Sequence, residues 1–299
     1  MATILITGAS GLIGNALSGA LEGQGHRVHK LGRGSSNPAQ NTFQWDLANG
    51  TLDERCLEGV SHVVHLAGAG IADKRWTRAR LNELIDSRAA SARLLHSAVE
   101  RSGQRIDAFV SAAGINYYGA VTTNKVFTES DRPGSDTIAH ISVEWEKAVD
   151  EWEAHTRVVK LRTPMVLARE GGALKKLALP VRWGAGAALG SGKQWVPWVH
   201  LEDLVRIYLA ALFNERFIGA YNVNTGNDVT NDTLMRTLAQ VLHRPYFLPK
   251  VPGFMLRLAL GELADILLAG SRASNERLLT LGFTFEHREL KSALHDLLG

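Results

Sequence analysis

Short apolar runs alternate with longer amphipathic stretches over most of the chain. The helix-like stretches between the runs include 12–25 and 79–103. Runs this short that alternate with helical patterns predict a parallel sheet covered by helices on both faces. We therefore expect an α/β fold with a doubly wound parallel sheet. The predicted strands are 3–7, 26–31, 42–47, 61–68, 107–113, 157–162 and 219–224.

The pattern changes at about residue 244 to prolines followed by mainly helical sequence. This predicts a Rossmann domain over 1–243, with a substrate-loop insertion at about 171–200, and a smaller, mainly helical C-terminal lobe over 244–299. The apolar stretch 252–270 carries Arg257, Glu262 and Asp265. Charges at this density indicate an amphipathic helix pair rather than a membrane span, so we expect no membrane partner.

Three glycines stand between the first predicted strand and the first helix, in LITGASGLIGNAL. Gly8 permits a tight turn, Gly11 lets the backbone approach a pyrophosphate, and Gly14 allows the helix to pack closely on the strand. Because this spacing lies within a βαβ unit, it predicts dinucleotide binding. The loop residues that complete the site are Ser10, Leu12 and Ile13.

The segment KLGRGSS, which ends the second predicted strand, contains no acidic residue. An NAD site usually places an Asp or Glu there to accept a hydrogen bond from the ribose 2′-hydroxyl. Arg33, helped by Lys30, Ser35 or Ser36, instead suits the 2′-phosphate of NADP(H). We therefore expect NADP(H) as the cofactor, with a solvated loop arginine as the alternative.

The next two strand ends carry further candidates. Asp46 follows the third strand and is either a partner for the adenine amino group or a simple loop cap. Ala67 and Gly68, in HLAGAG, are small enough for the backbone to pass close to the cofactor ribose or phosphates. A tight turn is the alternative explanation for this glycine.

Several longer motifs resemble the extended short-chain dehydrogenase/reductases of the NAD-dependent epimerase/dehydratase superfamily. SAAGINYYG resembles the fifth-strand segment of nucleotide-sugar epimerases, and LRTPMVL the sixth-strand segment beside the nicotinamide. WVHLEDL resembles a motif that begins a late helix. IADKRWT, GSGKQ and GELADILLAGSRASNERLLTLGFTF resemble, more specifically, the epimerase-family proteins that carry a small C-terminal domain. The resemblance implies a Rossmann-type fold, NADP(H) as cofactor and a C-terminal substrate lobe.

The resemblance also implies a set of cofactor contacts. A guanidinium at position 88 would reach phosphate or ribose from a helix beside the sheet, and a surface-exposed arginine is the alternative. The carboxylate at position 83 would need a sugar hydroxyl or a basic partner. The implied contacts are Gly32, Arg33, Leu66, Ala67, Glu83, Arg88 and Val166.

The segment TIAHISVEWEKA lacks the catalytic pair of the wider superfamily. In that superfamily a tyrosine donates or accepts the proton at the reacting oxygen, and a lysine four residues later lowers the pKa of the tyrosine. Ile138 and Ser142 occupy these positions here, and the group that this chain resembles generally lacks the pair as well. Candidate replacements are Tyr117, Tyr118 and His140. Packing is the alternative for the tyrosines, and a position on the helix surface for the histidine.

Two loops are candidates for the substrate pocket. Trp76, in IADKRWT, predicts a lid over the nicotinamide, or else a basic surface turn with one packed tryptophan. Gln194, Trp198 and His200 lie within the glycine-rich stretch 184–200 and are candidate substrate contacts, with ordinary packing as the alternative. We expect no metal site, since no histidine–carboxylate pair at i,i+4 is recognised and nothing resembles HExxH.

The composition limits the partners. A net charge of +3 without a basic block argues against nucleic acid, although it suits an anionic ligand. Cys56 is the single cysteine, which excludes an internal disulfide framework and a cysteine metal site. Because the first predicted strand begins at residue 3, we expect no targeting segment. We expect a cytoplasmic monomer or homodimer.

Three functions remain open at this stage. The first is an NADP(H)-dependent oxidoreductase that acts on an unidentified small carbonyl or alcohol. The second is a sugar-nucleotide epimerase or dehydratase, and the third is a non-enzymatic NADP(H) sensor, for example in cell-division control. The missing tyrosine and lysine favour the sensor. The long loop and the C-terminal lobe favour the enzymes, because a sensor needs no substrate cavity.

Overall fold

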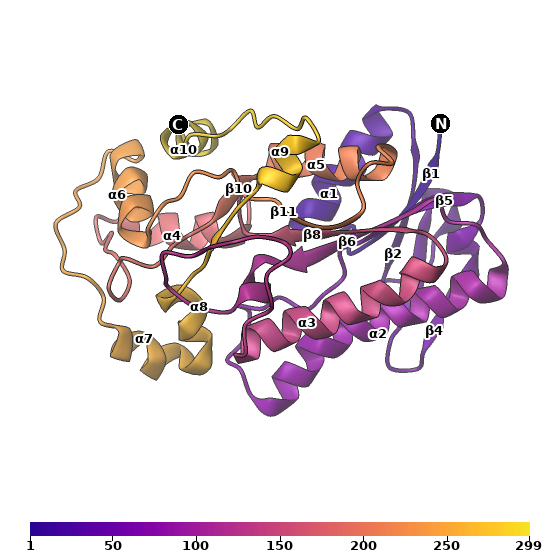
Figure 1. The fold of residues 1–299 in the computed structure, drawn as a ribbon, viewed down its shortest axis with the longest axis horizontal. Helices are drawn as coiled ribbons and strands as arrows, with labels where there is room; N and C mark the ends of the chain where they lie inside the picture. Colours follow the sequence, from indigo (N-terminus) through magenta and orange to yellow (C-terminus); the bar gives the residue numbers. More distant parts are fainter.

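A computed structural model describes residues 1–299, and its core is an eight-stranded sheet (Figure 1). The strands of this sheet are β1 (Thr3–Thr7), β2 (Arg27–Gly32), β3 (Thr42–Asp46), β4 (Thr51–Leu52), β5 (Val60–His65), β6 (Ala108–Gly114), β8 (Arg157–Thr163) and β11 (Gly219–Asn222). Their order is β11-β8-β6-β5-β1-β2-β3-β4, and only the β3–β4 pair is antiparallel. Each of the seven predicted strands is present in this sheet.

Helices cover both faces of the sheet, which confirms the doubly wound architecture. On one face α1 (Leu12–Gly23) and α5 (Leu201–Phe213) pack against a core that includes Ile4, Val110 and Leu161. On the other face α2 (Arg78–Ser102) and α3 (Thr137–Asp150) lie side by side over a second core (Figure 1). The predicted first and second helices therefore form at the expected places.

The strand order reverses at β1, which pairs with β2 on one side and β5 on the other. In open α/β sheets the loops at the carboxyl ends of such neighbouring strands separate and form the ligand crevice. The glycine loop follows β1, the KLGRGSS segment ends β2, and HLAGAG follows β5. The topology therefore gathers all three predicted cofactor segments at one edge of the sheet.

A second, smaller core lies beyond the carboxyl edge of β8 and β11. It combines the two-stranded sheet of β9 (Met165–Leu167) and β10 (Trp198–His200) with α4 (Gly172–Arg182), α6 (Asn231–Val241) and α10 (Leu290–Leu298). The last of these helices belongs to the final segment of the chain, whereas the others precede residue 243. The second core thus combines elements from both predicted domains, 1–243 and 244–299.

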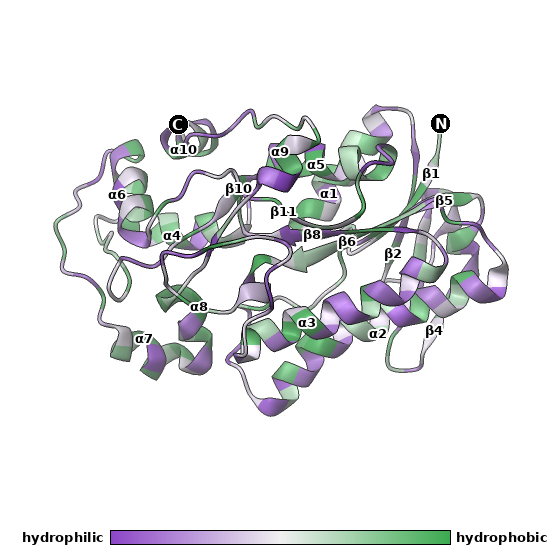
Figure 2. Cartoon of the chain, viewed as in Figure 1, coloured by the Kyte–Doolittle hydropathy of each residue, from purple (hydrophilic) through white to green (hydrophobic).

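The remaining elements of the C-terminal region are short and mainly helical. The predicted helix pair in 252–270 is confirmed as α7 (Gly253–Leu260) and α8 (Ala264–Leu268), which η5 (Gly261–Leu263) connects, and α9 (Glu276–Thr280) follows. Figure 2 shows α7 as a largely hydrophobic helix at the periphery of the molecule. The two-residue strands β7 (Val126–Phe127) and β12 (Arg272–Ala273) pair with each other. No helix is long and apolar enough to cross a membrane.

The segment LRTPMVL divides between two sheets. Arg162 and Thr163 end β8, whereas Val166 lies in β9 and pairs with Val199 of β10. Pro164 separates the two strands, and its missing N–H and fixed φ end the β8 ladder at this point. The sequence placed Val166 in the sixth strand; the structure corrects this, since Val166 belongs to the small second sheet.

Candidate functional site

The glycine loop after β1 has close contacts that only glycine permits. Gly8 has a left-handed φ of +69°, and a Cβ there would lie 2.9 Å from the backbone carbon of Leu66. A Cβ on Gly14 would lie 2.4 Å from the Gly8 carbonyl oxygen. Gly11 begins α1 as its N-cap, and no side chain caps the helix. The uncapped N–H groups of the first turn and the helix dipole therefore form a site suited to an anion.

The other predicted loop residues surround this helix start. Ser10 is exposed, whereas Leu12 and Ile13 are half-buried. A Cβ added to Gly172 would lie 3.3 Å from the Leu12 side chain and 3.5 Å from the Val166 carbonyl oxygen. The structure therefore brings Leu12 and Val166 together, although more than 150 residues separate them in the sequence.

The end of β2 offers one cation that the protein itself does not pair. Arg33 is exposed, follows Gly32, and has neither an ion pair nor a side-chain hydrogen bond. Lys30 is 2.9 Å from Glu22, and the Ser36 hydroxyl donates to Asp53 at 2.6 Å. Ser35 is exposed and, like Arg33, makes no side-chain hydrogen bond within the protein. Of the predicted 2′-phosphate contacts, Arg33 and Ser35 are thus free.

Asp46, at the end of β3, serves as a loop cap. Its carboxylate accepts hydrogen bonds from the backbone N–H of Ala48 at 2.9 Å and from the Asn49 side chain at 2.7 Å. The side-chain and backbone hydrogen bonds from Asn49 lower the pKa of Asp46, with a smaller contribution from Ala48. These bonds occupy the carboxylate and favour the loop-cap interpretation.

The backbone after β5 lies against both the glycine loop and α2. The N–H groups of Leu66 and Ala67 donate to the Thr7 hydroxyl, at 3.1 Å each. A Cβ on Gly68 would lie 2.9 Å from the guanidinium carbon of Arg88. Gly68 therefore allows the side chain of Arg88 to pass directly beneath this loop, which explains the glycine better than a tight turn does.

Arg88 is a buried cation with no carboxylate partner. Its side chain donates to the carbonyl oxygens of Leu84 and Ala69, at 2.9 Å each, and lies over the ring of Trp145. Its Nε is buried without a hydrogen-bond partner. Burial, followed by the charge of Arg80, lowers the pKa of Arg88 to about 10. The structure excludes the surface-exposed alternative for this residue.

The carboxylate of Glu83, on α2, is paired with a basic side chain of the same helix. The Glu83 carboxylate is 2.7 Å from Arg80. This hydrogen bond lowers the pKa of Glu83, and the charges of Arg80, Lys74 and Arg33 lower it further. The charge of Arg33, which follows β2, thus acts on a carboxylate of α2. As a cofactor contact, Glu83 stays a prediction.

Apolar side chains surround the two vacated catalytic positions. Ile138 is buried in a cluster with Leu84 and Ile141, against which Trp76 and Ile266 pack. The buried Ser142 hydroxyl donates to the Ile138 carbonyl oxygen at 3.1 Å and faces Gly114 at the end of β6. Neither position holds a group that transfers protons at neutral pH.

The three replacement candidates lie in different surroundings. Tyr118, in η3 (Ile115–Tyr118), is 1% exposed. Its hydroxyl accepts a hydrogen bond from Arg162 and lies within donating distance of the Thr128 carbonyl oxygen and the Asn222 side-chain oxygen. Burial raises the pKa of Tyr118 to about 12, although the charge and hydrogen bond of Arg162 act to lower it. Tyr117 is half-buried, and its hydroxyl makes no hydrogen bond within the protein. His140 is exposed on α3. The catalytic assignments stay predictions.

A buried ion pair beside the tyrosines was not predicted. The Arg162 guanidinium on β8 donates to both oxygens of Glu146 on α3, at 2.8 and 2.9 Å. It also stands 3.6 Å over the ring of Tyr117. Glu146 follows Ser142 by one helical turn, so its inward position was visible in the sequence. Its partner was not, because β8 follows α3 only after an intervening loop.

The three candidate substrate residues of the stretch 184–200 are buried. The Gln194 amide donates to the carbonyl oxygens of Leu189 and Leu267, at 3.0 and 2.7 Å. Trp198 is fully buried in the second core. His200 is 1% exposed and caps α5 by accepting from the Glu202 N–H at 3.3 Å. As substrate contacts, these residues stay predictions.

The segment around Trp76, for which a lid is one prediction, is held by contacts on two sides. The Trp76 indole N–H donates to the Ile71 carbonyl oxygen at 3.0 Å. Arg75 approaches Gly261 of η5, where an added Cβ would lie 3.3 Å from its guanidinium. The C-terminal region therefore contacts this segment, which lies over the vacated catalytic position.

The expectation about histidine spacing is wrong. His96 and Glu100 stand four residues apart on α2, and the His96 Nδ1 is 3.5 Å from the Glu100 carboxylate. His155, from another element, is 3.3 Å from the same carboxylate. The i,i+4 pair was readable in the sequence and was overlooked, whereas the third side chain required the fold.

Comparison with known proteins identifies relatives over the whole chain. Residues 4–224 match the NAD dependent epimerase/dehydratase family, and residues 251–297 match a domain of unknown function, DUF1731. Epimerase family protein ML0860 of Mycobacterium leprae is 35% identical over 295 residues, covering 98% of this chain and 94% of its own. Epimerase family protein YfhF of Bacillus subtilis is 33% identical, covering 99% and 98%.

Solved structures agree with this assignment. The crystal structure of human epimerase family protein SDR39U1 with NADPH superposes with a TM-score of 0.88 at 29% identity, covering 99% of this chain and 98% of the human one. MoeE5 in complex with UDP-glucose and NAD, at 22% identity and a TM-score of 0.78, shares the fold. With a family match over most of its length and relatives that align from end to end, the chain belongs to the NAD dependent epimerase/dehydratase family.

Proposed function

We propose that this chain binds NADP(H) in the crevice at the carboxyl edge of β1, β2 and β5. The observation that carries the proposal is a pair of arginines without anionic partners. Arg33 is free at the end of β2, and Arg88 is buried beneath the β5 loop with an unpartnered Nε. A buried cation is costly unless an anion compensates it. The related human protein that crystallised with NADPH supports the same choice.

Different residues at the crevice would hold different parts of the cofactor. The uncapped first turn of α1 would hold the pyrophosphate, and Arg33 with Ser35 would hold the 2′-phosphate. The backbone at Leu66 and Ala67 would lie along the ribose, with Arg88 behind it. When bound, NADP(H) supplies or accepts a hydride, and the protein contributes binding, orientation and exclusion of water.

The reaction that we propose is oxidoreduction of a small carbonyl or alcohol without the tyrosine–lysine pair. Of the three candidate proton donors, Tyr117 is a phenol whose hydroxyl is free of protein hydrogen bonds, whereas the hydroxyl of Tyr118 is fully used. A proton would therefore reach the substrate oxygen from Tyr117 or from water. Replacement of Tyr117 by Phe tests this, since reduction that is unaffected by the change would assign the proton to water.

A second candidate function is a non-enzymatic NADP(H) sensor. The apolar cluster at Ile138 favours it, because Trp76 of the lid segment and Ile266 of α8 meet there. A cofactor-dependent change in the lid would reach the C-terminal region directly through these contacts. Sugar-nucleotide epimerisation is less well supported, since it requires a base at the position that Ile138 occupies.

The decisive test of the cofactor proposal compares NADPH and NADH binding in an Arg33→Ala variant. Loss of charge-assisted bonds to the 2′-phosphate should weaken NADPH binding about 10- to 100-fold. NADH binding should change little. Arg27→Ala, an exposed arginine at the opposite end of β2, is the matched control. An equal loss for both nucleotides would overturn the 2′-phosphate assignment, and a chain that binds neither would overturn the proposal.

A further inference from the structure

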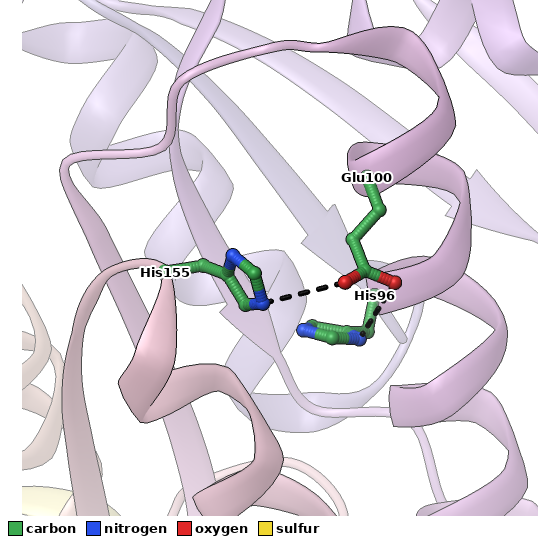
Figure 3. A group of neighbouring side chains, drawn as sticks. All are labelled: His96, Glu100 and His155. Atoms are coloured by element: carbon green, nitrogen blue, oxygen red, sulfur yellow. Dashed lines mark ion pairs between the residues drawn. The ribbon is translucent and has the colours of Figure 1, made fainter.

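Three side chains with metal-binding groups meet at the edge of the sheet opposite the cofactor crevice. His96 and Glu100 lie in the last turns of α2, which ends before β6 begins. His155 directly follows η4 (Glu151–Ala154) and precedes β8. Because parallel strands begin at this edge and end at the crevice, the cluster is remote from the proposed NADP(H) site. Figure 3 shows the Glu100 carboxylate facing both imidazole rings, with an ion pair drawn to each.

The spacing of the ligand atoms fits a small tetrahedral cation. The Glu100 oxygens are 3.5 Å from the His96 Nδ1 and 3.3 Å from the His155 Nε2. All three ligand atoms lie within 4.8 Å of one another. Zinc binds imidazole nitrogen and carboxylate oxygen at about 2.0–2.2 Å, so neighbouring ligands on a tetrahedron stand ~3.3–3.5 Å apart. Each histidine nitrogen lies at about this distance from the Glu100 carboxylate, His96 Nδ1 from one oxygen and His155 Nε2 from the other.

The fold holds the two histidines in place before any ion arrives. The His96 ring stands edge-on against Trp152, with centroids 5.0 Å apart. Trp152 is fully buried and stacks on Phe109. The backbone N–H of His155 donates to the Trp152 carbonyl oxygen at 3.0 Å. Trp152 therefore positions the His96 ring through its side chain and the backbone at His155 through its carbonyl oxygen.

The arrangement leaves one coordination position open. The cluster lines a cavity of ≈ 390 Å³, and Arg105 and Thr156 contribute to its wall. Three protein ligands with an open fourth position are typical of zinc sites that retain a water or a small ligand. The site would also link the end of α2 to the segment that leads into β8, across 55 residues of sequence.

The other histidine group is a poorer candidate. His200, Glu202 and His287 also lie close together. However, His200 Nδ1 already accepts a hydrogen bond from the Glu202 N–H, and its ring stacks on His287 with centroids 3.7 Å apart. A metal ion would have to separate these stacked rings before their nitrogens could converge on it, whereas the His96 and His155 rings meet edge to face with centroids 5.0 Å apart.

We propose that His96, Glu100 and His155 form a binding site for one zinc ion, with a solvent molecule as the fourth ligand. The ligands come from two elements that are distant in the sequence, so the site exists only in the folded chain. Zinc should therefore stabilise the fold according to its free concentration relative to the dissociation constant. The site is independent of the NADP(H) proposal, and its test uses no nucleotide.

The test uses the full-length chain without a polyhistidine tag, freed of metal with a chelator and then titrated with Zn²⁺. We expect one equivalent bound and a concentration-dependent rise in the melting temperature. Glu100→Gln and His155→Gln, both half exposed, should each weaken binding more than about 100-fold, since even partners outside the ligand shell cost about 10- to 100-fold. His287→Gln is the matched control and should bind Zn²⁺ like the original chain.

Several results would overturn the proposal. One is a chain that takes up no stoichiometric Zn²⁺, and another is binding that survives both ligand substitutions. Loss of binding in His287→Gln alone would assign the ion to the second histidine group and would equally overturn it. Co²⁺ substitution tests the geometry without any variant. The intense visible bands of four-coordinate Co²⁺ are expected, and the weak bands of six-coordinate Co²⁺ would contradict the site.

Discussion

Two buried arginines, Arg88 on α2 and Arg162 on β8, show how differently the two halves of the site are built. Both are nearly inaccessible to solvent, at 6% and 3% exposed. Arg162 has a bidentate carboxylate partner in Glu146 and a further bond to the Tyr118 hydroxyl. Arg88 has two carbonyl oxygens, the Ser87 hydroxyl and an aromatic ring but no carboxylate, and its Nε has no partner.

The pKa values of these groups shift in opposite directions. Burial acts to lower the pKa of Arg162, but the hydrogen bonds and charge of Glu146 and Tyr118 outweigh it and raise that pKa above its ordinary value. Burial lowers the pKa of Arg88 to about 10, because nothing anionic opposes it. The protein compensates the charge of Arg162 with a carboxylate and leaves Arg88 without one. This difference fits the proposed role of Arg88 as a cofactor contact and a structural role for the pair at α3.

Breaking the internal pair should have the largest effect. Glu146→Ala leaves the Arg162 charge buried without its carboxylate, and we expect a loss of about 3–5 kcal/mol in the free energy of unfolding. Urea unfolding measures it. Glu144→Ala, which removes an ion pair of the more exposed helix surface with Lys147, is the matched control and should cost under about 1 kcal/mol. Equal losses in the two variants would show that the buried pair has no special weight.

A second prediction concerns pH and His65, the neighbour of Arg88. Burial, helped by the charge of Arg88, lowers the pKa of His65 from 6.5 to about 3 in the folded chain. Below pH 6.5 the His65 ring of the unfolded chain binds a proton, whereas in the folded chain it stays neutral until the pH approaches 3. The contribution of the neutral ring is therefore complete above pH 6.5 and is lost as the pH falls toward 3. Between pH 7 and pH 5 this amounts to about 2 kcal/mol.

The pH effect is isolated by difference. Urea unfolding of the original chain and of His65→Gln is measured at pH 7 and pH 5, and other titrating groups cancel in the comparison. The original chain should lose about 2 kcal/mol more than the variant over this interval. Parallel losses would mean that His65 accepts a proton in the folded state, and that the surroundings of Arg88 are less apolar than its burial indicates.

The unpaired arginine should behave differently from the paired one. Arg88→Met removes hydrogen bonds to two carbonyl oxygens but also relieves the desolvation of a charge, so stability should change by less than about 2 kcal/mol. NADPH affinity should fall about tenfold or more, because charge-assisted contacts to the cofactor are lost. Calorimetric titration and urea unfolding on the same variant give both values. A large loss of stability with unchanged affinity would invert the comparison.

The smallest effect is expected at His140. Its side chain is exposed on α3, so His140→Ala should alter the free energy of unfolding by less than about 0.5 kcal/mol and leave NADPH affinity unchanged. Unfolding and nucleotide titration check this. A marked loss of affinity would show that the exposed face of α3 takes part in cofactor binding.

The same distinction explains which parts of the site could be predicted. The glycine loop is local, because the positive φ of Gly8 and the close approach of Gly14 depend on residues within one βα turn. The absence of an acid after β2 is equally local. The Glu146–Arg162 pair, the burial of Arg88 beneath Gly68, and the contact of Gly172 with Leu12 join segments far apart in the chain. No periodicity within one segment reports such contacts.

The sequence by itself determined the seven parallel strands, the two helices α1 and α2, the cofactor loop and the loss of the tyrosine–lysine pair. Each of these depends on residue type and short spacing, which restrict local backbone geometry directly. Only the tertiary structure decided that Gln194, Trp198 and His200 face inward, that the second core combines α10 with α4 and α6, and that His155 joins His96 and Glu100. These depend on how finished elements pack, and packing is settled by shape and burial between surfaces that meet only in the folded chain.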